Sequence, residues 1–276
     1  MMNQNEKLFL PVFSEMKGVR GFFSTKAGAS EGSPYNRREV LQAQGLERMQ
    51  LISPKQVHGD HIEVIDPERP ELLQNRESGN FAEPIRFPDT DGVITDATGI
   101  LLTTVHADCL AVYFYDEAHH AIGLVHAGWR GSCLGISQKA VRMMQECYGS
   151  EPSQIRAFIG PGISKCCFEV GDEVVAAFCE NWSFAGEYAE PRQMKSANSD
   201  ASKQEDGNDG QPEAVRKYLM DLKGINHRQL TEIGLKPEHI QVSSHCTYCE
   251  GELFCSYRRE GGTYKRMGAG LWLTED

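Results

Sequence analysis

The chain has 276 residues, of which 40% are hydrophobic and 24% charged, which is the composition of a globular protein. These values exclude a collagen, a coiled coil and a wholly disordered chain, and no apolar run approaches the roughly 18 residues that suggest a membrane span. The formal net charge of −11 argues against nucleic acid as a partner, because polyanion binders need a basic face. The first residues lack the basic and apolar regions of a secretory signal, so we expect a cytoplasmic protein without a membrane partner.

The nine cysteines form an odd-numbered set without a compact pattern of spacings. In a chain without a secretory signal, such a set is typical of a reducing compartment, where thiols stay free or bind metals. We therefore expect no disulfide framework.

The first part of the chain predicts short strands and one helix. The helix is expected over 36–46, and the polar stretch 67–88 is expected to be a surface excursion. Strands are predicted over 19–25, 51–52 and 62–65.

The centre of the chain carries the densest strand pattern. Four short apolar runs predict strands over 92–96, 100–106, 111–116 and 121–127. Because these runs are continuously apolar, we expect strands that are covered on both faces. A single helix is predicted over 131–148.

The last part of the chain mixes both kinds of element, so the sequence predicts an α+β fold in one domain over 1–276. Residues 187–213 hold seven acidic and three basic residues, and we expect this insertion to be disordered or exposed. The predicted elements are a strand over 155–159, a helix over 172–182, a helix ending at Ile233, and strands at IQVSS, LFCSYRR and GAGLWL.

Side chains that can bind a metal stand at the ends of the central strands. Cys109 and His126 are separated by one strand, a turn and a second strand, so a hairpin would bring them to the same level. A thiolate with one or two imidazoles, from His58 or His106, suits zinc and leaves a fourth position open. The alternative interpretation is that these cysteine and histidine residues are structural and are either hydrogen-bonded or packed in the core.

Two further patterns carry weaker predictions. Arg130 directly precedes a predicted helix start, where an anion pocket and a simple loop cap are both plausible. Cys246 and Cys249 form a C-x-x-C pair without a second such pair. Because Cys166 and Cys167 are adjacent in sequence, we expect them to converge poorly on one ion and the C-x-x-C to be structural or incidental.

Eight segments together resemble one known family. They are KQVHGD, DTDGVITD, HADCLAVYFYD, GLVHAGWRGS, IGPGIS, CFEVGDEV, YLMDLKGINHRQL and LFCSYRREGG. They are similar to the YfiH/YlmD family, whose members have been called multicopper polyphenol oxidoreductases or laccases and, more recently, zinc-dependent purine nucleoside phosphorylases. The resemblance implies a YfiH-like fold of mixed sheets with helices packed outside.

The same resemblance implies a metal centre and a reaction. The implied ligands are His58, Cys109 and His126, with zinc as the cofactor and copper as a possible substitute. The implied partners are purine nucleosides and phosphate: adenosine, inosine and 5′-methylthioadenosine would be cleaved by phosphate, and adenosine would also be deaminated. On position in these motifs, the catalytic candidates are Cys109, Asp108 and Asp91, and the substrate- or phosphate-binding candidates are Arg130, Lys26, Lys55 and Gln56.

Three alternatives stay open. A laccase-like polyphenol oxidase would hold copper in the same site, although nine histidines without any H-x-H pair exclude a blue-copper oxidase with a trinuclear centre. A hydrolase or amidase acting on peptidoglycan precursors would use Cys109 as nucleophile and His126 as base. A zinc-stabilised binding module would unfold on metal removal. The sequence leaves the oligomeric state open.

Overall fold

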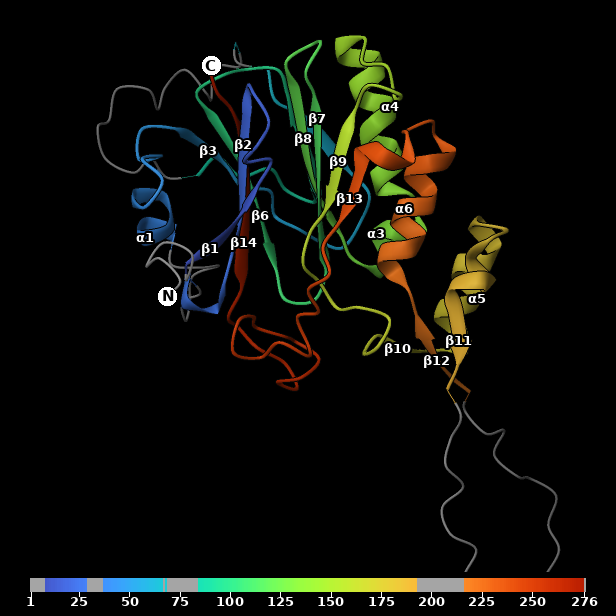
Figure 1. The fold of residues 1–276 in the computed structure, drawn as a ribbon. Coiled ribbons are helices and arrows are strands. Elements are labelled where there is room, and N and C mark those ends of the chain that lie inside the picture. Colours follow the sequence, from blue (N-terminus) through green and yellow to red (C-terminus); the bar gives the residue numbers. More distant parts are fainter. Residues whose placement is uncertain (1–7, 29–36, 67, 69–83, 193–215, 276) are drawn as a thin grey trace, which may run out of the picture.

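The computed structural model describes residues 8–28, 37–66, 68, 84–192 and 216–275. Three β-sheets and a set of helices form a layered α+β fold (Figure 1), which confirms the predicted fold class. Within these described ranges, no helix combines the length and apolar character needed to cross a bilayer.

The first sheet has five strands in the order β1-β2-β14-β6-β3. Its strand β14 lies in the middle and pairs antiparallel with both β2 and β6. Its outer face packs on the short helix α1 (Arg37–Gln42), which buries Val40 and Leu41 there. The strands are β1 (Phe9–Val12), β2 (Val19–Ser24), β3 (Gln50–Ile52), β6 (Ile100–His106) and β14 (Met267–Leu273).

The second sheet has six strands in the order β13-β9-β7-β8-β5-β4. Its centre is the long hairpin of β7 (Leu110–Asp116) and β8 (Ala121–Ala127), in which every residue is buried. The outer strands are β4 (Ile62–Val64), β5 (Gly92–Thr95), β9 (Arg156–Ile159) and β13 (Ile240–Val242). This full burial agrees with the continuously apolar sequence of both central strands.

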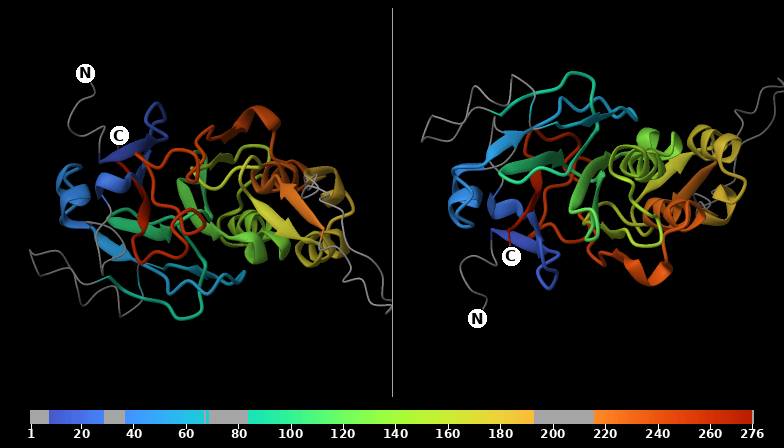
Figure 2. Two further views of the ribbon diagram at one scale, coloured as in Figure 1. Left: turned by 90° about the horizontal axis from the view of Figure 1, so that it is seen from below. Right: turned by 90° about the horizontal axis from the view of Figure 1, so that it is seen from above.

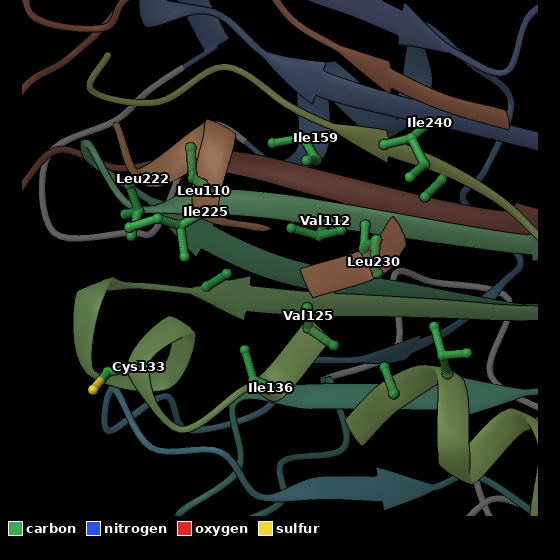
Figure 3. Packing of buried hydrophobic residues seen from close by; sticks show 14 of the residues in the cluster. Leu110, Val112, Val125, Cys133, Ile136, Ile159, Leu222, Ile225, Leu230 and Ile240 are labelled. Atoms are coloured by element: carbon green, nitrogen blue, oxygen red, sulfur yellow. The ribbon is translucent and has the colours of Figure 1, made fainter. Parts of the chain in front are cut away.

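Strand alternation divides the core into two layers. Ala111, Tyr113 and Tyr115 of β7 face the first sheet, whereas Leu110 and Val112 face the helices. Figure 3 shows this helix-facing layer, and Figure 2 shows the order of α1, the two large sheets and the helices across the molecule.

Three helices cover the second sheet: α3 (Trp129–Cys133), α4 (Ile136–Tyr148) and α6 (Leu222–Glu232). The single helix predicted over 131–148 is therefore wrong. Gly135 separates α3 from α4 with a left-handed backbone (φ 77°), and a Cβ there would lie 2.9 Å from the Trp182 ring. Only glycine avoids both penalties at this position.

A small third sheet lies beside α5 (Asp172–Asn181) and consists of β10 (Glu169–Gly171), β12 (Lys217–Met220) and β11 (Ala189–Pro191). Part of it falls within the expected insertion at 187–213, whose described residues 187–192 are mostly exposed. Tyr188 lies in the 3-10 helix η3 (Ala185–Tyr188), and β11 pairs with β12. Residues 193–213 lie outside the described residues.

The strand predicted at LFCSYRR is also wrong, since residues 253–259 form turns. Local hydrogen bonds replace ladder partners in this segment: Ser256 N–H donates to Glu260, and the Arg259 guanidinium donates to the carbonyls of Thr247, Tyr248 and Phe254. Two further 3-10 turns are η2 (Lys26–Gly28) and η4 (Pro237–His239).

Candidate functional site

His58, Cys109 and His126 converge at one end of the two large sheets. One potential donor atom from each of the three lies within 4.8 Å of the other two. The two imidazole rings stand edge to face with their centroids 4.9 Å apart. The structure therefore brings together the three residues that the family resemblance implied as ligands.

The β7/β8 hairpin explains the approach of Cys109 to His126. Ala111 pairs with His126 in the antiparallel register. Cys109, two residues before Ala111, therefore lies opposite Gly128 and diagonal to His126. Diagonal positions on one face of an antiparallel pair lie within reach of each other's side chains. The neighbours of His126 on β8, Val125 and Ala127, face the helices, so the side chain of His126 points to the other face, between the two sheets.

Gly128 leaves the space that these side chains occupy. A Cβ at this position would lie 3.2 Å from Cys109 Sγ and 3.2 Å from a carbon of the His58 ring. Its backbone is extended (φ −70°, ψ 171°), which any residue can adopt. The glycine is therefore required for space and not for conformation.

The loop that carries His58 is held by a buried carboxylate. Asp91 accepts backbone N–H groups from Val57 at 3.1 Å, His58 at 3.0 Å and Gly59 at 2.8 Å. These three bonds support the left-handed conformation of His58 (φ 64°), which costs energy for a residue other than glycine. Gln56 fixes the same loop to β6, because its amide group exchanges two hydrogen bonds with the backbone of Val105.

Asp91 also orients His126. Its Oδ1 lies 2.8 Å from His126 Nδ1, which leaves Nε2 for the face toward Cys109. Both side chains are buried, with 0% of Asp91 and 3% of His126 exposed. A carboxylate on the far nitrogen of a histidine is the usual arrangement behind a metal ligand, because it fixes the tautomer and raises the basicity of the ring.

The local charges perturb the pKa values of both buried side chains, Cys109 and His126. Burial alone would raise the pKa of Cys109, but the neighbouring imidazoles of His126 and His58 outweigh it and lower that pKa to about 6. Burial would likewise lower the pKa of His126, but the Cys109 thiolate and the Asp91 carboxylate raise it to about 9. The thiolate form of Cys109, which is the form that binds metals, is thus favoured near neutral pH.

The donor chemistry of this group fits a borderline divalent ion. One sulfur and two imidazole nitrogens are ligands that zinc and copper both accept, and three protein ligands leave one position for a substrate. His106 was the nearest competitor for a ligand role. Its ring nitrogens instead contact Thr104 Oγ1 at 2.8 Å and the Cys109 carbonyl at 3.1 Å, and burial lowers its pKa well below the ordinary value.

These ligands line one pocket of about 540 Å³, which lies within the range of small-molecule sites. Three arginines, Arg130, Arg258 and Arg266, line the same pocket, and in the described part of the chain none of them pairs with a carboxylate. Arg130 lies 4.5 Å over the Trp129 ring. The other lining residues are Gln56, Val105, Ala107, Asp108, Trp129, Ile163, Phe168 and Tyr257.

Asp108 lines the pocket in a strained backbone conformation (φ 88°). Its carboxylate accepts hydrogen bonds from Thr247 Oγ1 at 2.6 Å, Ser256 Oγ at 3.0 Å and the Arg258 N–H at 2.8 Å. The 247–258 segment, which the sequence predicted in part as a strand, thus holds the turn between β6 and β7. Arg258 and Arg266 were not among the predicted site residues, although Arg258 lies in the LFCSYRREGG segment that carries part of the family resemblance.

The structure does not bring every predicted residue to this pocket. Arg130 and Gln56 line it, whereas Lys26 and Lys55 are not among its lining residues. The Lys26 ammonium donates to the Gly251 carbonyl at 3.0 Å, and the backbone of Lys55 pairs with Phe87 and Thr90. Asp91 lies behind the ligands, outside the pocket lining.

A second group corrects the expectation for the other cysteines. Cys166 and Cys167 lie next to the C-x-x-C pair, and the sulfur atoms of Cys166, Cys167, Cys246 and Cys249 all lie within 4.8 Å of one another. The prediction that adjacent cysteines converge poorly is wrong here, because two parallel strands deliver the loops to the same place. All nine cysteines are free thiols in this structure.

Comparison with known proteins identifies the class. Residues 30–274 match the model of the multi-copper polyphenol oxidoreductase laccase family, so the chain belongs to that family, and the YfiH/YlmD resemblance is confirmed.

Individual relatives carry two different activity names. The chain is 33% identical over 243 residues, 87% of its length and 78% of the relative, to a protein of Geobacillus stearothermophilus named purine nucleoside phosphorylase YlmD. It is 31% identical over 228 residues, 83% of its length and 77% of the relative, to adenosine deaminase RL5 from an unknown prokaryotic organism. A solved structure of the hypothetical protein YfiH from Bacillus licheniformis superposes with a TM-score of 0.75 at 29% identity and covers 97% of both chains.

Proposed function

We propose that this protein is a zinc-dependent purine nucleoside phosphorylase that acts on adenosine, inosine and 5′-methylthioadenosine and that also deaminates adenosine. The observation that carries the proposal is one pocket in which a His-Cys-His donor group lies beside three arginines that pair with no carboxylate among the described residues. The names of the relatives support the same two activities.

The arginines supply the site for phosphate. Arg130, Arg258 and Arg266 stay charged at any ordinary pH, and guanidinium groups bind phosphate oxygens through paired hydrogen bonds. In phosphorolysis a phosphate oxygen forms a bond to ribose C1′ while the bond from C1′ to the base nitrogen breaks. Holding phosphate and nucleoside together therefore supplies much of the rate acceleration.

The apolar side of the pocket suits the purine. Trp129, Phe168 and Tyr257 offer ring faces, and a flat heterocycle gains by stacking on such rings. The base leaves with a proton, so the site also needs a polar group that can exchange one.

The two acidic candidates take different roles in this proposal. Asp108 lines the pocket and can reach a bound nucleoside, so it is the acid/base candidate. Asp91 is 0% exposed and its oxygens already accept four hydrogen bonds, so it acts as a positioning residue for His126 and the His58 loop.

His58, Cys109 and His126 would hold the metal. When bound there, zinc would supply Lewis acidity to the pocket. Copper competes for the same donors, and its affinity for most ligand sets exceeds that of zinc. We assign zinc as the working metal, and the test below includes both metals.

The decisive experiment incubates metal-free protein, reloaded with zinc or copper, with adenosine or inosine in the presence and absence of phosphate. We expect free base and ribose 1-phosphate only with zinc and phosphate, and inosine from adenosine without phosphate. A His58→Ala variant should lose both activities, and the matched Cys179→Ser variant, an exposed thiol outside the pocket, should keep them. Absence of both products from the zinc-loaded protein would refute the proposal.

One feature favours a second candidate, a cysteine hydrolase. Cys109, His126 and Asp91 form a chain of thiol, imidazole and carboxylate like that of nucleophilic catalysis. Such an enzyme would keep its activity after treatment with a chelator and would lose it on alkylation of Cys109. Activity that disappears with the metal and returns with zinc excludes it.

A further inference from the structure

Four cysteine side chains form a compact cluster apart from the His-Cys-His group. The sulfur of Cys166 lies 3.8 Å from that of Cys246 and 3.7 Å from that of Cys249, and Cys167 and Cys249 are separated by 3.3 Å. No sulfur pair in the group exceeds 4.8 Å. Disulfide bonds require about 2.05 Å, so these are four separate thiols facing one point.

These separations match the edges of a metal-thiolate tetrahedron. With zinc–sulfur bonds of about 2.3 Å, the sulfur atoms of a tetrahedral site lie about 3.8 Å apart. The three measured edges differ from that value by at most half an ångström. The other three sulfur pairs lie within 4.8 Å, so each needs to close by at most about 1 Å to complete a tetrahedron.

The fold creates this cluster through one parallel strand pair. β13 pairs with β9 in parallel, so the loops that follow both strands leave at the same edge of the sheet (Figure 1). Gly162 and Cys246 continue the pairing as an isolated bridge. Cys166 and Cys167 then close one loop over the Cys246–Cys249 turn of the other.

The surroundings of Cys246 and a nearby lysine favour negative charge on this sulfur. The Ser164 N–H donates to Cys246 Sγ at 3.4 Å, and the backbone N–H groups of Tyr248 and Cys249 interact with the same sulfur. The Lys223 ammonium, only 6% exposed, donates to the carbonyls of Ser243 and His245 and places a buried positive charge beside the cluster. Four thiolates around a divalent ion carry a net charge of −2, which this ammonium offsets in part.

We propose that Cys166, Cys167, Cys246 and Cys249 bind a tetrahedral zinc ion, as a second metal centre distinct from His58, Cys109 and His126. Four thiolates leave no position for a substrate, so this centre is structural. It staples the loop after β9 to the loop after β13.

Thr247 and Arg258 connect the proposed second metal centre to the pocket. Thr247, which lies between the two ligands of the C-x-x-C turn, donates the 2.6 Å hydrogen bond to Asp108. Arg258 borders both the substrate pocket and the hollow beside Cys166 and Cys167. Loss of the second metal should therefore loosen the Asp108 turn without removing any of the three catalytic ligands.

Counting metal tests the proposal on the full-length chain. Wild-type protein reloaded with excess zinc and desalted should hold about two zinc ions by mass spectrometry of the elements. A Cys246→Ser/Cys249→Ser variant and a His58→Ala/His126→Ala variant should each hold about one. The matched Cys147→Ser/Cys179→Ser variant, which removes two exposed thiols elsewhere, should still hold about two.

Alkylation of the wild-type protein provides a measurement that needs no variant. Zinc should protect Cys166, Cys167, Cys246 and Cys249 from iodoacetamide, while Cys147 and Cys179 react at the same rate with and without metal. In the His58→Ala/His126→Ala protein the same four thiols should stay protected. This result separates the second centre from the proposed catalysis, since it holds whether or not nucleosides are cleaved.

Three results would overturn the proposal. One is a wild-type protein that holds a single zinc ion, all of it lost in the His58→Ala/His126→Ala variant. Another is equal alkylation of the four thiols with and without zinc in reduced protein. A disulfide between Cys167 and Cys249 in freshly purified, unreduced protein that then fails to take up zinc after reduction would also refute it.

Discussion

The carboxylate of Asp91 joins two metal-ligand candidates, because it contacts His126 Nδ1 at 2.8 Å and accepts the backbone N–H of His58 at 3.0 Å. His126 belongs to a central strand, whereas His58 lies on a loop, and the two are 68 positions apart in the sequence. One buried side chain therefore sets the distance between two ligands that no backbone pairing connects.

Replacing Asp91 by Asn should weaken metal binding without removing a ligand. The NH2 group of asparagine cannot accept the backbone N–H groups that donate to the Asp91 carboxylate, so the loop that carries His58 would shift. By analogy with other carboxylates behind metal ligands, we expect the zinc affinity to fall about 10- to 100-fold in a competition with a chromogenic chelator. Asp60→Asn, which alters a half-exposed ion pair with Lys139, is the control and should change nothing. Equal affinities for both variants would contradict this role.

Gly128→Ala should weaken metal binding at the same site by a steric effect alone. The added methyl group would press on Cys109 Sγ and the His58 ring, each 3.2 Å away, while the backbone accepts alanine without strain. We expect at least a tenfold loss of zinc affinity with a shift of less than about 1 kcal/mol in the unfolding free energy, a size usual for a tolerated substitution. Chelator competition and urea denaturation measure the two effects. Gly186→Ala, whose methyl would meet Cys179 Sγ only at 3.9 Å, should leave both unchanged.

Arg130→Ala should affect phosphate more than nucleoside. If the guanidinium binds phosphate, its removal raises the KM for phosphate by about tenfold or more, because a charge-assisted contact contributes about 1.5–3 kcal/mol. The KM for inosine should change less than threefold. Arg142→Ala, which removes an exposed arginine of α4, is the matched control. Unchanged phosphate kinetics in the Arg130 variant would remove this residue from the role.

Asp116 provides a pH prediction away from both metal groups. Burial alone would raise its pKa, but hydrogen bonds from the His119 ring at 2.7 Å and the Ala118 N–H at 3.0 Å help lower it below the ordinary value. A depressed carboxyl pKa stabilises the folded state above the unfolded pKa, and that contribution is lost as the pH falls through the folded pKa.

The Asp116→Asn variant should therefore be less stable than wild type at pH 7, by about 1.5–3 kcal/mol, and the difference should shrink below about pH 4. Urea denaturation at a series of pH values measures it. Glu117→Gln changes the exposed neighbouring carboxylate and should leave the curve as it is. A constant difference between wild type and Asp116→Asn across that range would show that the carboxylate charge plays no part.

The sequence predicts what depends on local pattern. The apolar runs of β6, β7 and β8 indicated buried strands, and the spacing of Cys109 and His126 anticipated their meeting across one hairpin. The choice of His58 over His106 as a ligand candidate required the family resemblance, because long-range hydrogen bonds from Asp91 and Gln56 place the loop of His58.

Long-range contacts account for the rest. The parallel pairing of β9 with β13 joins segments some 80 positions apart. No sequence pattern near Cys166 indicates that Cys246 lies beside it in the fold. The LFCSYRR segment looks like a strand because Leu253, Phe254 and Cys255 form a short apolar run that is followed closely by a tyrosine. Its polar groups instead serve Asp108, about 150 positions earlier in the chain.

The central place of β14 in the five-stranded sheet bears on how the protein matures during translation. β2 and β6 cannot be joined until residues 267–273 have left the ribosomal tunnel, so the nascent chain must wait with two unpaired strand edges. A premature stop codon before Met267 would remove β14 and leave β2 and β6 without the strand that joins them. Such a product should be recognised by chaperones and proteases.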